Sequence, residues 1–145
     1  MQSTLLTDGR EKTFVLIFKT GDEAMAGLRE FACEKNLSGS HFTAIGAFRD
    51  VTLAYFDWEW KEYRKIPVNE QVEVVSLVGD IALKDGQPEV HAHAVIAKRD
   101  GTAHGGHLLE AHVRPTLEVV LTEAPGHLQR KFDAASGLAL IDLEA

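Results

Sequence analysis

The chain has 145 residues, 45% of them hydrophobic and 26% charged, as expected for one globular domain over residues 1–145. Its one cysteine, Cys33, excludes an internal disulfide and is predicted to be a buried, inert thiol. The net charge of −7, with no run of Lys and Arg, disfavours DNA binding. No segment has the pattern of a signal peptide or the ~20 apolar residues of a membrane span, so we expect a cytoplasmic protein.

The first predicted elements are a strand and a helix. Residues 13–18 are β-branched and aromatic, which is typical of a buried strand. The sequence from Thr20 to Glu23 fits a capping box, with Thr20 as the N-cap and Glu23 at the third helical position. A helix is therefore predicted from about residue 22 to 35, ended by Asn36 in a left-handed conformation. Its apolar residues recur at helical spacing: Met25, Leu28, Phe31 and Ala32.

Strands dominate the rest of the chain. They are predicted at residues 41–48, 51–58, 72–83, 90–97, 108–113 and 116–123. The strand at 41–48 is expected to break near Gly46, and Pro115 separates the strands at 108–113 and 116–123. Gly79 is a candidate bulge, and turns are expected at residues 85–86 and 99–101. From Pro125 onward a loop is expected, ending in the apolar residues 138–143. Because these connections are too short for helical crossovers, we expect an α+β fold: a largely antiparallel, twisted sheet with one or two packed helices.

Histidines concentrate in one of the predicted strands. In residues 89–97, Val90, Ala92, Ala94 and Ile96 share one face, and His91 and His93 share the other. Two imidazoles on one strand face can converge on a single metal ion. Whether a third histidine joins them depends on the turn that follows.

Two registers are open at this turn. A three-residue connection, with Gly101 left-handed in a G1 bulge, sets His93 opposite His107. A two-residue turn sets Ala94 opposite His107 and moves that imidazole to the other face. The glycine pair 105–106 could also bulge the strand and re-aim His107. We prefer the first register, which groups three histidines.

The remaining histidines are weaker candidates. His104 and His112 lie an odd number of residues from His107, so a regular strand points them the other way. Three neutral imidazoles with an open position form the ligand set of many zinc sites and suit other late transition metals. The alternative interpretation is a polar sheet face whose histidines only titrate.

Several short segments carry a family resemblance through their order and spacing. They are His91-Ala-His93 through Asp100-Gly101, Gly105-Gly106-His107-Leu108, Thr116-Leu117-Glu118-Val119, Gly21-Asp22-Glu23, Ala44-Ile45-Gly46-Ala47, Tyr55-Phe56-Asp57 and Lys61-Glu62-Tyr63. Together they resemble the plants and prokaryotes conserved (PPC) domain in its stand-alone prokaryotic form, over residues 10–143. The resemblance implies a sheet-rich homotrimer and a metal site at His91, His93 and His107, and it places Glu118 at a recurrent acidic position.

Two functions remain open from the sequence. The first is a homotrimer that binds a divalent transition metal together with a small-molecule ligand or substrate. Zinc is the ion that we expect first. Glu89, Glu110 and Glu118 are candidate bases in such a site, but the sequence names no reaction. The rival is a DNA-associated regulator, because plant members of the family carry AT-hooks. This chain has no Arg-Gly-Arg-Pro core and no basic patch. A purely structural trimerisation module is the third reading.

Overall fold

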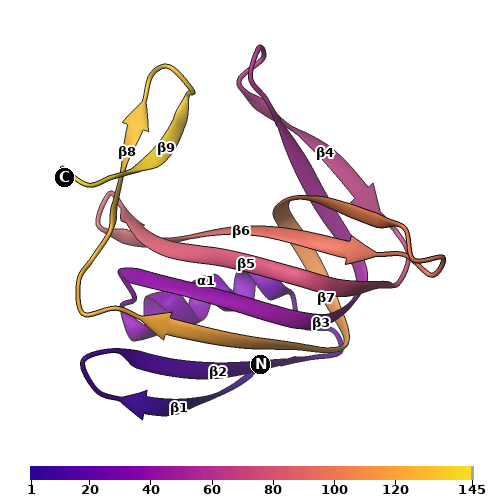
Figure 1. Ribbon diagram of the computed structural model, residues 1–145, viewed down its shortest axis with the longest axis horizontal. Coiled ribbons are helices and arrows are strands. Elements are labelled where there is room, and N and C mark those ends of the chain that lie inside the picture. The colour runs from indigo at the N-terminus through magenta and orange to yellow at the C-terminus, as the bar shows by residue number, and fades with distance from the viewer. Residues whose placement is uncertain (145) are drawn as a thin grey trace.

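The computed structural model describes residues 1–144 and consists of nine strands and one helix (Figure 1). In chain order these are β1 (Gln2–Asp8), β2 (Lys12–Lys19), α1 (Ala24–Lys35), β3 (Gly39–Asp57), β4 (Glu62–Val68), β5 (Val72–Lys84), β6 (Gln87–Ala97), β7 (Ala103–Glu123), β8 (Gln129–Asp133) and β9 (Leu138–Asp142). The predicted α+β class, a mostly antiparallel sheet with a packed helix, is confirmed. Within the described part, no helix is long and apolar enough to cross a membrane.

The sheet is ordered β1-β2-β7-β3-β5-β8-β9, with β4 paired to β3 and β6 paired to both β5 and β7. Every pairing is antiparallel except a single parallel bridge between Leu83 of β5 and Gln129 of β8. Figure 1 shows the β8–β9 hairpin and the outer part of the β3–β4 hairpin rising on the same side of the sheet, at its two ends. Strand β6 lies between them and carries two of the candidate histidines.

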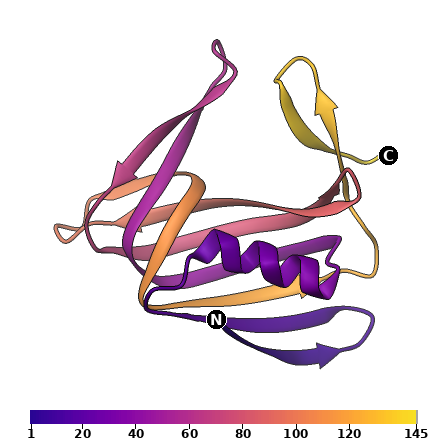
Figure 2. The same ribbon diagram turned by 180° about the vertical axis from the view of Figure 1, so that it is seen from behind.

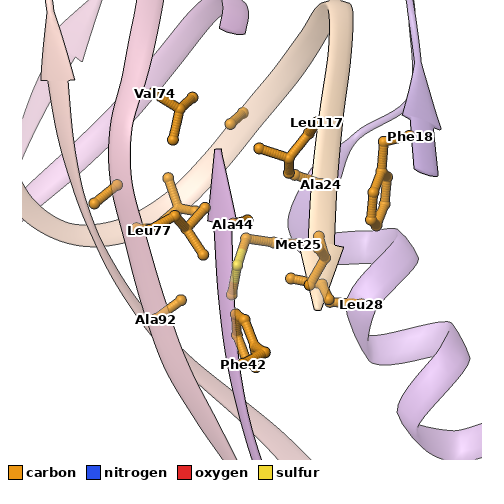
Figure 3. Packing of buried hydrophobic residues seen from close by; sticks show 14 of the residues in the cluster. Phe18, Ala24, Met25, Leu28, Phe42, Ala44, Val74, Leu77, Ala92 and Leu117 are labelled. Carbon is orange, nitrogen blue, oxygen red and sulfur yellow. The ribbon is translucent and has the colours of Figure 1, made fainter. Parts of the chain in front are cut away.

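Helix α1 covers one face of the sheet, as Figure 2 shows from behind. Its side chains Met25 and Leu28 pack toward Phe42 of β3, Leu77 of β5 and Ala92 of β6 (Figure 3). Leu28 and Leu77 are fully buried. Each such leucine contributes roughly 1.5–3 kcal/mol from the removal of apolar surface from water. This packing fixes the inner face of β6 and turns its alternate residues outward.

The helix begins differently from the prediction. Its N-cap is Glu23 and not Thr20, and the Glu23 carboxylate accepts hydrogen bonds from the backbone of Met25 and Ala26. The same carboxylate accepts the backbone N–H of Ala111 in β7 at 2.9 Å. Glu23 therefore ties the helix start to the sheet, a tertiary contact that the capping-box pattern could not reveal. The helix ends as predicted, at Asn36, whose backbone is left-handed with φ 52°.

Two predicted strand breaks are wrong. Segments 41–48 and 51–58 form one strand, β3, and segments 108–113 and 116–123 form one strand, β7. The two strands pair along most of their length, and their register shifts between the pairs Gly46–Leu117 and Phe48–Val113. The shift leaves Pro115, which has no N–H to donate, in an unpaired bulge. Long-range pairing therefore outweighs both local breakers.

Other expectations also need correction. No register shift occurs at Gly79; a Cβ there would lie 2.3 Å from the Phe42 ring, so glycine is needed for close packing. The irregularity of β5 lies between Val74 and Ser76. The expected C-terminal loop contains the β8–β9 hairpin, and strands β1 and β4 were not predicted. Cys33 lies on the exposed face of α1 and is not buried.

Candidate metal centre

Strand β6 has the predicted alternation of buried and outward-facing residues. Its apolar residues Val90, Ala92, Ala94 and Ile96 are all buried. His91 is partly exposed and His93 is exposed on the opposite face. The core packing of the four apolar residues thus holds both imidazoles on the side of the sheet away from α1.

The turn between β6 and β7 has the three-residue form. Gly101 has φ +82°, and its N–H donates to the Lys98 carbonyl at 2.9 Å. The Lys98 N–H donates to the Thr102 carbonyl at 2.9 Å and closes the bulged turn. Counted outward from this pair, His93 lies opposite His107, and the preferred register is confirmed.

The structure brings the three histidines together. The Nε2 atoms of His91 and His93 are 3.2 Å apart. The ring centroid of His107 lies 5.1 Å from that of His91 and 5.4 Å from that of His93. One ring nitrogen of each histidine lies within 4.8 Å of the other two, and this is the one such group found within residues 1–144. The arrangement allows one small cation to contact all three rings.

Two further residues orient these rings. The Asp80 carboxylate of β5 lies 3.7 Å from Nδ1 of His91, the ring nitrogen that does not face His93. Tyr63 of β4 stacks on the His107 ring, with centroids 4.5 Å apart. Burial alone would raise the pKa of Asp80, but the neighbouring His91 imidazole and the charge of Arg130 outweigh burial and lower it. A carboxylate behind a histidine is the usual partner that fixes the tautomer of a metal ligand.

Two of the three clustered histidines, His93 and His107, have lowered pKa values, which favour the neutral imidazole. Burial, followed by the positive charges of His91, His93 and Arg29, lowers the pKa of His107 to about 4. Burial and the neighbouring His91 also lower the pKa of His93. A neutral imidazole is the form that binds a metal ion, so the lowered pKa values of His93 and His107 are in the direction that suits metal ligands.

The weaker candidates lie outside the cluster. His104 is exposed and pairs with Ile96 across the β6–β7 ladder. The Nδ1 atom of His112 lies 2.6 Å from the Asp50 carboxylate, so this side chain already has a partner. Glu118 is exposed on β7 opposite Ile45 of β3. The candidate bases Glu89 and Glu110 contact Lys84 and His112, respectively.

Three residues around the cluster were not predicted as site residues from the sequence: Tyr63, Asp80 and Arg130. A signal for Asp80 was present, because counting outward from the two-residue turn 85–86 places it opposite His91. No comparable signal exists for Tyr63 or Arg130, which reach the site from the β4 and β8 segments by tertiary packing.

Comparison with known proteins identifies relatives over nearly the whole chain. A metal-containing protein from Archaeoglobus fulgidus is 37% identical, with 90% of this chain and 92% of that chain covered and a TM-score of 0.83. A plant- and prokaryote-conserved protein from Pyrococcus horikoshii is 32% identical, with 97% and 94% covered and a TM-score of 0.85. A protein from Bacteroides thetaiotaomicron, described as a candidate DNA-binding protein, is 26% identical, with 99% of both chains covered and a TM-score of 0.89.

None of the curated proteins matches the chain. The profile of the plants and prokaryotes conserved domain matches residues 6–125, which include all three clustered histidines. The match spans well over half of the sequence and agrees with the resemblance carried by the short segments. This chain therefore belongs to the plants and prokaryotes conserved domain family.

Proposed function

We propose that this protein binds one divalent transition metal ion through His91, His93 and His107. The observation that carries the proposal is the convergence of one nitrogen from each ring within 4.8 Å. Two nitrogens bound to one zinc ion at about 2.05 Å, at a tetrahedral angle, lie about 3.3 Å apart. The Nε2 atoms of His91 and His93 are 3.2 Å apart, which matches this spacing. The metal-containing relative from Archaeoglobus fulgidus supports the same assignment.

Zinc is the ion that the ligand set fits best. Three neutral imidazoles and one open position form a common catalytic and ligand-binding arrangement of tetrahedral zinc. Asp80 stands behind His91 in the place where such sites keep a carboxylate. The open position leaves room for water or a small-molecule ligand, and we place ligand binding there.

We further propose that the protein assembles as a homotrimer, the state that the family resemblance implies. Five aliphatic side chains on the central strands are 42–61% exposed: Ile45, Val75, Val78, Val95 and Val120. Val78 lies opposite His93 in the β5–β6 ladder, so this apolar surface adjoins the metal site. The accessible surface of 8306 Å² exceeds the about 7,400 Å² expected of a compact 16.0 kDa monomer, as expected for a chain whose hairpins pack on partners.

The metal site is tested by elemental analysis of untagged protein. Wild type is expected to carry about one metal ion per chain, and His93→Ala and His107→Ala to carry none while keeping the wild-type circular dichroism spectrum. His104→Ala is the matched control, because this histidine lies on the same hairpin but outside the cluster. Wild-type protein that is free of metal and takes up no zinc, cobalt or nickel on titration would refute the proposal.

DNA association is the second candidate function, because the relative from Bacteroides thetaiotaomicron is described as a candidate DNA-binding protein. The net charge of −7 opposes it, since phosphate contacts supply most of the affinity for duplex DNA. We therefore rank metal and small-molecule binding first.

A further inference from the structure

A pocket of about 390 Å³ opens beside the histidine cluster, and its walls come from distant parts of the chain. His91 and His107 line it on the metal side, and Tyr63 contributes an aromatic ring. The opposite wall is the β8–β9 hairpin, which rises next to the β5–β6 turn (Figure 1). Any molecule bound in this pocket contacts the edge of the metal centre.

The pocket carries an excess of positive charge. Of the charged groups that line it, Lys84 is paired with Glu89 at 3.1 Å, and Arg130 is paired with Asp80 behind the wall. Arg29 of α1 also lines the pocket, and within residues 1–144 it has no ion-pair partner. The positive charge of Arg29 is therefore not neutralised by a neighbour in this part of the chain. A divalent metal ion bound at the histidines would add two further positive charges. A pocket with this balance favours an anion.

Arg130 is a fixed part of this wall. Its side chain is only 5% exposed, and one terminal nitrogen donates to the Ala139 carbonyl at 3.3 Å while the other contacts Asp80. Its Nε atom is buried and has no hydrogen-bond partner within residues 1–144. Because its charge is paired with Asp80, Arg130 holds the wall in place, and the unpaired positive charge of the lining, among the described residues, is that of Arg29.

The rest of the lining selects the size and character of the anion. The hairpin presents Leu138, Ala139 and Leu140 to the pocket, and the core strand presents Val90. The volume lies near the lower end of the range for small-molecule sites, roughly 300–1,000 Å³. It suits a compact organic molecule with an apolar part, and it is too small for a nucleic acid duplex.

We propose that this pocket binds a small organic carboxylate. The carboxylate group is attracted by the metal ion and by Arg29, and the apolar part of the ligand packs against Leu138 and Leu140. The inference rests on the proposed metal site and names the ligand class of that site. Arg29 is a binding residue in this proposal and not a metal ligand, so the two proposals can be separated by experiment.

The test measures ligand binding to zinc-loaded protein by isothermal titration calorimetry. The probes are benzoate, the neutral isostere benzamide, acetate and inorganic phosphate. Benzoate is expected to bind at least about tenfold more tightly than benzamide, and Arg29→Gln to weaken benzoate about tenfold, as expected for the loss of one charged contact. Arg49→Gln is the matched control, because Arg49 is an exposed arginine that does not line the pocket.

The metal content of every variant is measured in parallel. If Arg29→Gln keeps its zinc and loses benzoate affinity, both proposals stand. Zinc-loaded wild type that binds no carboxylate at about 10 mM, or binds it equally well in Arg29→Gln, overturns the carboxylate pocket and leaves the metal site intact. Phosphate that binds as tightly as benzoate overturns the choice of ligand class, and wild type that takes up no zinc overturns both proposals.

Discussion

Acid should destabilise the metal-free protein through His107 in particular. The pKa of this imidazole is held at about 4 in the folded chain, first by burial and then by the positive charges of its neighbours. In the unfolded chain it returns to its ordinary value of about 6.5. Between these two values the unfolded chain binds a proton that the folded chain does not. Stability is therefore complete above about pH 6.5 and falls as the pH decreases toward 4.

The size of the effect follows from the two pKa values. Between about pH 7.5 and pH 4.5, the titration of one such group lowers the free energy of unfolding by at most about 2.5 kcal/mol. His107 is only partly buried, and solvent screens the charges around it. We therefore expect about 1–2 kcal/mol from this residue.

The assay is urea unfolding of chelator-treated wild type and His107→Gln at both pH values. The change in unfolding free energy from neutral to acid pH is expected to be about 1–2 kcal/mol smaller in His107→Gln than in wild type. Comparing each protein with itself removes the pH-independent cost of losing the Tyr63 stacking contact. His127→Gln is the control, because that histidine is exposed and outside the cluster. Equal acid losses in wild type and His107→Gln would refute the reasoning.

Three other predictions concern the fold, the assembly and DNA. Gly46→Ala should lower the free energy of unfolding in urea by at least about 2 kcal/mol, because φ of Gly46 is +154° and the new Cβ would lie 2.2 Å from the Thr116 carbonyl oxygen. The control Gly126→Ala, whose new Cβ would meet no atom within 4 Å, should lower it by less than about 0.5 kcal/mol. Light scattering should give a trimer for wild type and a smaller species for Val120→Asp, and a monomeric wild type at micromolar concentration contradicts the assembly. Electrophoretic mobility shifts should detect no nanomolar, sequence-specific duplex binding at physiological salt, and such binding in the presence of competitor DNA would restore the DNA-associated function.

The geometry of the site was predictable because its information is local. Strand alternation places His91 and His93 on one face, and a single left-handed glycine, Gly101, fixes the register that brings His107 across from His93. The same counting from the turn at residues 85–86 leads to Asp80. In a hairpin with a tight turn, the length of the turn fixes which residues pair across the two strands. The register of such a hairpin can therefore be predicted from the local sequence.

The remaining errors arise where distant segments decide the structure. Gly46 and Pro115 are local breakers, yet both lie within continuous strands because β3 and β7 pair on both sides of the bulge that contains Pro115 and begins next to Gly46. Strand β8 pairs with the rest of the sheet through one bridge, so its position depends on side-chain packing that no periodic pattern encodes. The pocket beside the histidines could not be predicted for the same reason, because Arg130 and Leu138 of its lining belong to the β8–β9 hairpin.

The three histidines and one wall of the proposed pocket come from different parts of the chain. The three histidines lie within residues 6–125, the range matched by the family profile, on strands whose opposite faces form the core. The hairpin that supplies Arg130, Leu138 and Leu140 lies beyond that range and is joined to the sheet at one edge. Substitutions in the hairpin can therefore change the shape and charge of the pocket without disturbing the core beneath the imidazoles. Under the two proposals, substitutions in the hairpin are expected to change which carboxylate the pocket accepts while the three histidines keep their positions.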